Sequence, residues 1–101
     1  MQFDQVSVGK KADVYFDGKC VSHTVTLPDG TRKSVGVVLP STLRFDLTTK
    51  EVMEVVDGTA YVSINGQAEK LFSAGQSWTV EAGGYFVIRA DQPVHYVCHF
   101  G

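Results

Sequence analysis

The sequence lacks the features of proteins that bind nucleic acid polymers or span membranes. Nine lysines and arginines stand against eleven aspartates and glutamates, for a formal net charge of −2. There is no basic excess to neutralise a phosphodiester backbone. No apolar run approaches the roughly 20 residues that span a bilayer. We expect no contact with membranes or nucleic acid polymers, which leaves a single nucleoside or nucleotide open as a ligand.

Cysteines are few, and there is no recognisable targeting segment. Residues 1–5 contain neither a basic region nor an apolar region, so we expect no secretory signal. Cys20 and Cys98 match no metal or redox spacing. Buried free thiols in a reducing compartment are favoured over a disulfide. We therefore predict a cytoplasmic protein with two unbonded cysteines.

Helical periodicity is also missing, whereas strand signals recur at short intervals. Residues 21–27 alternate between apolar and polar side chains, and Pro28-Asp29-Gly30-Thr31 supplies a turn. Asp57-Gly58 and Asn65-Gly66 flank a short apolar segment, and both dipeptides are typical of two-residue hairpins. Residues 94–100 alternate again. The pattern predicts about nine or ten short strands in a sandwich or barrel, as one domain over residues 1–101.

The middle of the chain has a spacing that resembles the cupin superfamily. In that family two histidines two residues apart precede a glutamate, and a glycine follows about seven residues later. Glu51 and Gly58 hold the last two places here, whereas Arg44 and Asp46 stand where the histidines would be. Phe86 takes the place of the third histidine. The resemblance implies an all-β cupin-type barrel, jelly-roll or RmlC-like, that lacks the metal-binding histidines.

These replacements argue against a metal site. A divalent ion needs three or four converging N, O or S ligands. Arginine cannot supply one, and Phe86 has no donor atom. His95 and His99 are four residues apart on an expected strand, so their backbones lie about 13 Å apart at about 3.3 Å per residue. We therefore expect no metal cofactor.

The same positions are the candidate functional residues. We expect Arg44, Asp46 and Glu51 to point into the barrel with Phe86. A guanidinium suits a phosphate or carboxylate, carboxylates accept hydrogen bonds from sugar hydroxyls, and an aromatic wall can stack a base. The candidates are Arg44, Asp46 and Glu51 as catalytic residues and Phe45, Phe86 and His99 as substrate-binding residues. A second interpretation is that Arg44 forms a structural ion pair with Asp46 or Glu51, and the residues alone favour it.

Longer segments resemble one family of very small bacterial cupins, the pyrimidine/purine nucleoside phosphorylases. They are ADVYFDGKCVSHT at 12–24, SVGVVLP at 34–40, RFD at 44–46, EVMEVVDG at 51–58, AGQSW at 74–78 and HYVCHF at 95–100. One departure is that Val80 is followed by Glu81, where the family carries a proline. The match covers nearly the whole chain.

The resemblance implies a broad-specificity nucleoside phosphorylase, a pentosyltransferase. It would cleave purine and pyrimidine nucleosides with phosphate to free base and ribose 1-phosphate. The partners would be nucleosides and inorganic phosphate as co-substrate, with no cofactor, and a homodimer is the default for a barrel with strand edges to cover. The alternatives are a metal-free cupin that binds a small ligand without turnover and a degenerate cupin that serves as an interaction module. Only the phosphorylase predicts phosphate-dependent release of base.

Overall fold

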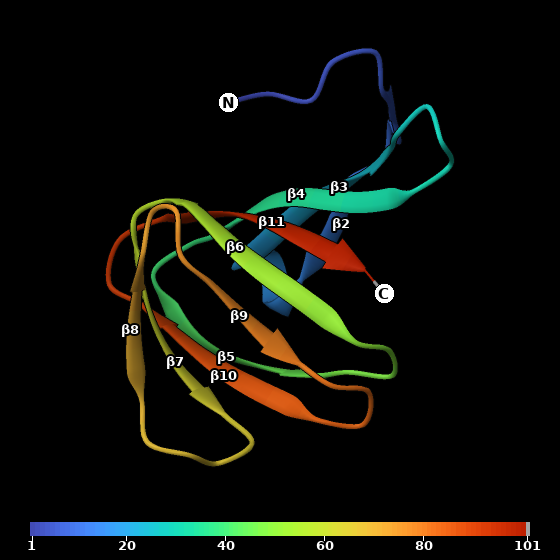
Figure 1. Cartoon of the computed structure of the whole chain (residues 1–101). Coiled ribbons are helices and arrows are strands. Elements are labelled where there is room, and N and C mark those ends of the chain that lie inside the picture. The colour runs from blue at the N-terminus through green and yellow to red at the C-terminus, as the bar shows by residue number, and fades with distance from the viewer. Residues whose placement is uncertain (101) are drawn as a thin grey trace.

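The computed structural model describes residues 1–100, which form two antiparallel β-sheets packed face to face (Figure 1). Sheet A contains β1 (Ser7–Val8), β2 (Asp13–Tyr15), β3 (Cys20–Thr26), β4 (Arg32–Val38), β6 (Glu51–Asp57), β9 (Ser77–Val80) and β11 (Val94–Phe100). Sheet B contains β5 (Ser41–Asp46), β7 (Thr59–Ile64), β8 (Lys70–Ser73) and β10 (Tyr85–Ala90). The only helical element in this range is a short 3-10 turn, η1 (Phe16–Gly18). The all-β prediction is confirmed; residue 101, the last of the predicted domain, lies outside the described residues.

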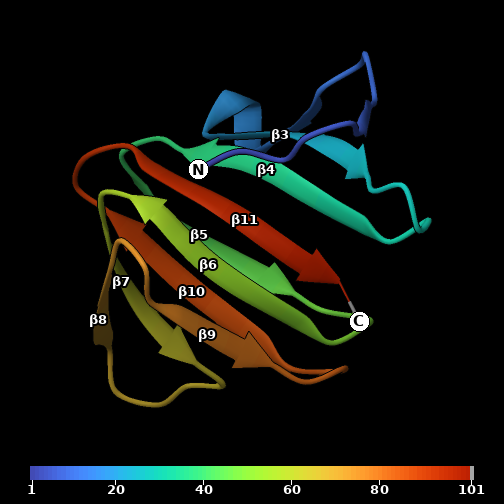
Figure 2. The same cartoon turned by 45° about the horizontal axis from the view of Figure 1, so that its top comes forward.

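The chain passes repeatedly between the two sheets. The order in sheet A is β1-β3-β4-β11-β6-β9, with β2 also paired to β3, and the order in sheet B is β5-β10-β7-β8. Figures 1 and 2 show β1 to β4 on one side of the molecule and β7 and β8 on the other. Strands β4, β11 and β6 are neighbours in sheet A, and β5 and β10 are neighbours in sheet B (Figure 2).

One end of the space between the sheets is packed with apolar side chains. Val38, Val55, Ile88 and Val94 are at most 1% exposed, and they come from four different strands. Alternate residues of each strand face this core, as the period of two requires. Because this end is filled, an open space between the sheets can lie only toward the other end, where β5 and β11 finish and β6 and β10 begin.

Both cysteines are buried free thiols, so the prediction that they are not bonded to each other is confirmed. Cys20 lies on β3 and Cys98 on β11. Both face the interior of the barrel rather than solvent.

The Asn65-Gly66 turn forms, although five residues, 65–69, rather than two connect β7 to β8, and the hairpin predicted at Asp57-Gly58 is absent. Asn65 and Gly66 both have positive φ, at 50° and 77°, as a type I′ turn requires. Asp57-Gly58 was expected to form a hairpin, and that is wrong, because β6 and β7 belong to different sheets. Gly58 instead turns the chain from one sheet to the other at φ 93°. A Cβ there would lie 2.5 Å from the carbonyl oxygen of Pro93, so only glycine fits this corner.

Within residues 1–100 there is no helix of the length and apolarity needed to cross a membrane.

Candidate functional site

A pocket of about 220 Å³ remains between the sheets at the end that the core does not fill. It is lined by Tyr15, Ser22, Ser34, Phe45, Asp46, Glu51, Met53, Phe86, Tyr96, Cys98 and Phe100. The register explains this gathering, because Phe45 pairs with Phe86 and Glu51 pairs with Phe100 at the ends of their strands. Four of the six candidate residues therefore reach one pocket: Phe45, Asp46, Glu51 and Phe86.

The side of the pocket formed by sheet B is aromatic. The rings of Phe45 and Phe86 stack at a centroid distance of 5.1 Å and an interplanar angle of 21°. Phe16 meets Phe45 edge-on at 5.3 Å, and Trp78 meets Phe86 edge-on at 5.6 Å. Phe86 is 1% exposed, whereas Phe45 is only half-buried. The pair is a rigid apolar wall on which a planar group can stack.

The side formed by sheet A carries hydroxyls and a thiol. Ser22 on β3 and Ser34 on β4 are buried, at 4% and 7% exposed, and both face the pocket. Tyr96 and Cys98 come from the neighbouring strand β11. Because Gly36 lies between Ser22 and Tyr96 in the register, the tyrosine hydroxyl can approach β3; a Cβ on Gly36 would lie 2.8 Å from it. We call Ser22, Ser34, Tyr96 and Cys98 the hydroxyl wall.

The groups of the hydroxyl wall are held in their neutral forms. Burial raises the pKa of Tyr96, and its contact with the Cys20 thiol at 3.3 Å adds to the rise. Burial also raises the pKa of Cys98, and the nearby Glu51 carboxylate raises it further. A group that stays protonated can donate a hydrogen bond. Cys98 donates its proton to Glu51, so the hydroxyls of Ser22, Ser34 and Tyr96 are the neutral groups that this wall presents to a ligand.

Glu51 is the carboxylate that reaches into the pocket from sheet A. It is half-buried, and the Cys98 thiol donates to its Oε1 at 3.3 Å. The pocket thus combines an aromatic wall, a wall of neutral hydroxyls and a carboxylate that is bonded to the Cys98 end of that wall. That combination suits a neutral ligand that has a flat part and a hydroxyl-bearing part.

The expected inward orientation of Arg44 and Asp46 is wrong. On β5 it is Leu43 and Phe45 that face the interior, whereas the Arg44 and Asp46 side chains are 57% and 69% exposed. Side chains alternate between the two faces of a strand, so Arg44 and Asp46 cannot share the inward face that Phe45 occupies. Arg44 donates to Asp46 at 3.0 Å, and its guanidinium lies 3.9 Å from the centre of the Tyr85 ring. The structure therefore shows the surface ion pair, with Asp46 at the edge of the pocket.

His99 does not join the pocket either. Cys98 and Phe100 face inward, so His99 between them points to the outer face of sheet A. Its Nδ1 accepts from the Lys33 ammonium at 2.7 Å, and its Nε2 donates to Glu54 at 2.9 Å. Sheet A therefore separates the His99 side chain from the pocket that contains Glu51, and His99 does not take the substrate-binding place predicted for it.

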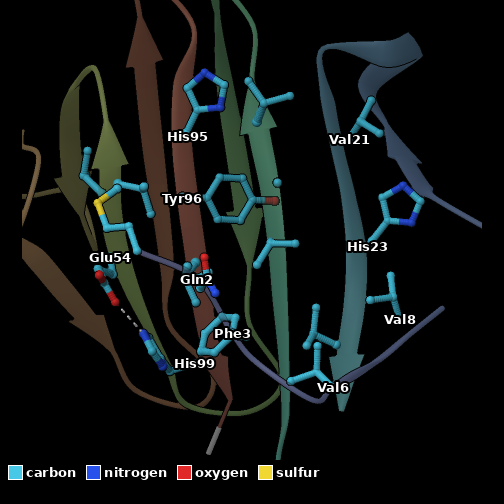
Figure 3. A pocket seen from close by; sticks show the side chains of 18 of the residues that line it. Gln2, Phe3, Val6, Val8, Val21, His23, Glu54, His95, Tyr96 and His99 are labelled. Carbon is cyan, nitrogen blue, oxygen red and sulfur yellow. Dashed lines mark hydrogen bonds and ion pairs between the residues drawn. The ribbon is translucent and has the colours of Figure 1, made fainter. Parts of the chain in front are cut away.

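A second and larger hollow, about 850 Å³, lies on that outer face beneath the N-terminal residues 1–8 (Figure 3). Valines of β3, β4 and β11 form its floor, and Figure 3 shows His23, His95 and His99 spread around it rather than converging. The smaller pocket is the better candidate despite its size, because it brings a carboxylate, neutral donors and stacked aromatics together. The outer hollow is an apolar sheet face with dispersed polar groups.

No group of three or more histidine, cysteine, aspartate or glutamate residues in the range 1–100 is arranged to hold a metal ion.

Sequence reasoning missed the hydroxyl wall. Ser22 and Ser34 lie in segments whose alternation is clear, but their neighbours Val21 and Val35 are the apolar residues and suggest the opposite face as the interior. Which face of β3 and β4 is the interior depends on which side of sheet A is covered by sheet B. The only available signal was on β11, where Tyr96 and Cys98 share a face with Val94.

Comparisons with known proteins agree on one family. The sequence profile described as pyrimidine/purine nucleoside phosphorylase matches residues 10–100. A protein of that name from Dechloromonas aromatica is 56% identical over 101 residues, covering 99% of this chain and 98% of the other. Another of that name, from Thiobacillus denitrificans, is 58% identical over 102 residues, again covering 99% and 98%.

Solved structures show the same fold. A protein of unknown function from Acinetobacter sp. ADP1 superposes with a TM-score of 0.96 at 44% identity, over 99% of this chain and 98% of that one. An RmlC-like cupin from Shewanella frigidimarina superposes with a TM-score of 0.73 at 15% identity, over 96% and 89%. The second likeness concerns the fold alone, and it confirms the predicted cupin-type barrel.

Proposed function

Because this chain belongs to the pyrimidine/purine nucleoside phosphorylase family, we propose that it cleaves purine and pyrimidine nucleosides with inorganic phosphate, releasing the free base and ribose 1-phosphate. The observation that supports the barrel pocket as the site of this reaction is that one wall of the pocket is aromatic and the other carries hydroxyls. A nucleoside is itself two-part, with a planar base and a polar sugar.

The aromatic wall supplies the base site of the proposal. Phe45, which is half-buried and backed by the stacked ring of Phe86, offers an apolar surface, and every purine and pyrimidine has a π-face that can lie against it. Stacking involves no directional hydrogen bond, so it discriminates weakly between bases. Broad base tolerance follows if the Phe45 ring is the main contact to the base.

The reaction needs positioning and charge stabilisation more than a protein nucleophile. A phosphate oxygen forms the new bond to C1′ while the bond from C1′ to the base nitrogen breaks. The leaving base keeps that electron pair and takes up the proton that hydrogen phosphate loses as it becomes the ribose 1-phosphate dianion. The sugar passes through a state with oxocarbenium character, as in glycoside cleavage. A Glu51 carboxylate beside C1′ would stabilise the developing positive charge electrostatically.

Phosphate would approach from the open end of the pocket. Asp46 lies at that edge, and its charge is already compensated by Arg44. The pocket is also smaller than the roughly 300 Å³ at which small-molecule sites usually begin. We therefore propose that the nucleoside is partly enclosed and that the phosphate meets C1′ from the solvent side.

The direct test is to incubate the purified protein with uridine, inosine and adenosine, with and without phosphate. We expect release of base that depends on phosphate and is unaffected by EDTA, since Glu51 and the hydroxyl wall supply the contacts. Chromatography of the base and of ribose 1-phosphate measures both products. Binding of nucleoside without release of base would favour the non-catalytic binder, and activity that EDTA abolishes and a divalent ion restores would contradict the metal-free interpretation.

Substitution of Arg44 tests whether this residue binds phosphate at the open end of the pocket. We expect Arg44→Ala to raise the KM for phosphate by no more than about threefold and to leave kcat and the melting temperature nearly unchanged, because the guanidinium is exposed and only neutralises Asp46. The effect should shrink at high ionic strength, where surface charges are screened. A loss of 30-fold or more would instead establish Arg44 as a phosphate ligand, which is the catalytic role first predicted for it. Arg89→Ala, at an equivalent exposed ion pair, is the matched control.

We further propose that the protein acts as a homodimer in the cytoplasm. The support is the apolar outer face of sheet A, with Val8 and Val14 more than half exposed, and the two buried thiols that a reducing compartment would preserve. Sedimentation velocity separates a dimer from a monomer, and a monomer at micromolar concentration would contradict the assembly.

A further inference from the structure

We infer that the hydroxyl wall, and Ser22 and Ser34 in particular, is the subsite that binds the ribose hydroxyls, an assignment that rests on the nucleoside site proposed above. Ser22 and Ser34 come from adjacent strands and are the buried polar side chains of the core. Both open onto the pocket rather than onto solvent. Serine hydroxyls both donate and accept hydrogen bonds, as sugar hydroxyls do.

The alternative occupant of this wall is phosphate, and the local charge argues against it. The charged side chains that line the pocket within residues 1–100 are Asp46 and Glu51, with no lysine, arginine or histidine among the lining residues. A phosphate dianion placed against the wall would lie beside the Glu51 carboxylate in the enclosed part of the pocket, with no cation to offset the repulsion, whereas a phosphate at the open end is screened by solvent. A ribose is neutral and can donate a hydrogen bond to that same carboxylate.

The ionisation of the wall points the same way. Burial, with the Cys20 thiol beside Tyr96 and the Glu51 carboxylate beside Cys98, keeps both groups protonated. An environment that disfavours a thiolate and a phenolate also disfavours a bound anion, whereas it accepts a neutral diol.

The geometry assigns an orientation to the whole nucleoside. The hydroxyl wall belongs to sheet A and the stacked Phe45–Phe86 pair belongs to sheet B, so the two walls face each other across the pocket. With the base on the aromatic wall and the sugar on the hydroxyl wall, the glycosidic bond lies between them. Glu51 lines the same space.

The experiment pairs enzyme variants with substrates that lack single hydroxyls. Ser22→Ala, Ser34→Ala and the exposed control Ser77→Ala are assayed with uridine, 2′-deoxyuridine and 3′-deoxyuridine, with the KM for phosphate measured throughout. We expect each wall variant to lower kcat/KM for uridine by about 3- to 10-fold. We expect little further loss on the deoxynucleoside that lacks the partner hydroxyl, an unchanged KM for phosphate, and no effect of Ser77→Ala.

Two results overturn the assignment. A raised KM for phosphate with uridine binding unchanged would place phosphate on this wall. Equal losses on all three nucleosides would leave the serines a structural role only. If no nucleoside is cleaved, the proposed phosphorylase function fails, and calorimetric titration of uridine and uracil then decides the subsite. Uridine binding that the wall variants weaken while uracil binding is unaffected supports it, and any other result, including no uridine binding, rejects it.

Discussion

Glu51→Gln is expected to lower kcat/KM for uridine phosphorolysis by about 100- to 1,000-fold, the usual effect of removing one preorganised electrostatic contact to a transition state. Glutamine keeps the shape and retains an oxygen that can accept from the Cys98 thiol, so the fold should persist. What is removed is the negative charge beside C1′. The loss should appear in kcat more than in KM, because the positive charge develops only as the bond to the base breaks.

Glu54→Gln is the matched control for this variant. Glu54 lies on the same strand, but it faces the outer hollow and accepts from His99 (Figure 3). We expect its substitution to change kcat/KM by less than about threefold. Steady-state kinetics with uridine and phosphate, together with melting temperatures, measure both variants. Similar losses in the two variants, or a loss of less than tenfold in Glu51→Gln, would contradict the catalytic role of Glu51.

The largest effect on stability is expected from Phe86→Ala. Phe86 is 1% exposed and contacts both Phe45 and Trp78, so truncation removes buried apolar surface and leaves a cavity. Substitutions of this kind lower the free energy of unfolding by about 3–5 kcal/mol. Urea denaturation followed by tryptophan fluorescence measures the change, since Trp78 is the chain's one tryptophan and packs against the substituted ring.

Two further variants distinguish the binding role of the aromatic wall from the contribution of the core to stability. Phe100→Ala alters an exposed residue at the mouth of the pocket and should change the free energy of unfolding by less than about 1 kcal/mol. Phe45→Leu should keep most of the stability, because Phe45 is only half-buried, while weakening nucleoside binding through the lost stack. A Phe86→Ala protein as stable as the unmodified chain would show that the two sheets are not held together at this contact.

Some of the site was accessible from the sequence because it depends on residue type and spacing. Glu51 was located by its distance from Gly58, and it does line the pocket. Phe45 and Phe86 were predicted as substrate-binding residues; both line the pocket, and their rings are stacked. Arg44 was expected to point inward as well, but its side chain lies on the opposite face of β5, because side chains alternate along a strand and the neighbouring Phe45 faces the pocket.

The sequence by itself determined the all-β class and the family, since alternation, turn dipeptides and long matched segments are local properties of the chain. The tertiary structure decided which face of each strand is the interior. Ser22 and Ser34 face inward and Val21 and Val35 outward because sheet B covers only one side of sheet A. It also decided that Asp57-Gly58 is a corner between sheets, since a dipeptide sets the local turn and not the partner of the strand that follows. Both outcomes depend on contacts between residues far apart in the chain, and no local pattern contains them.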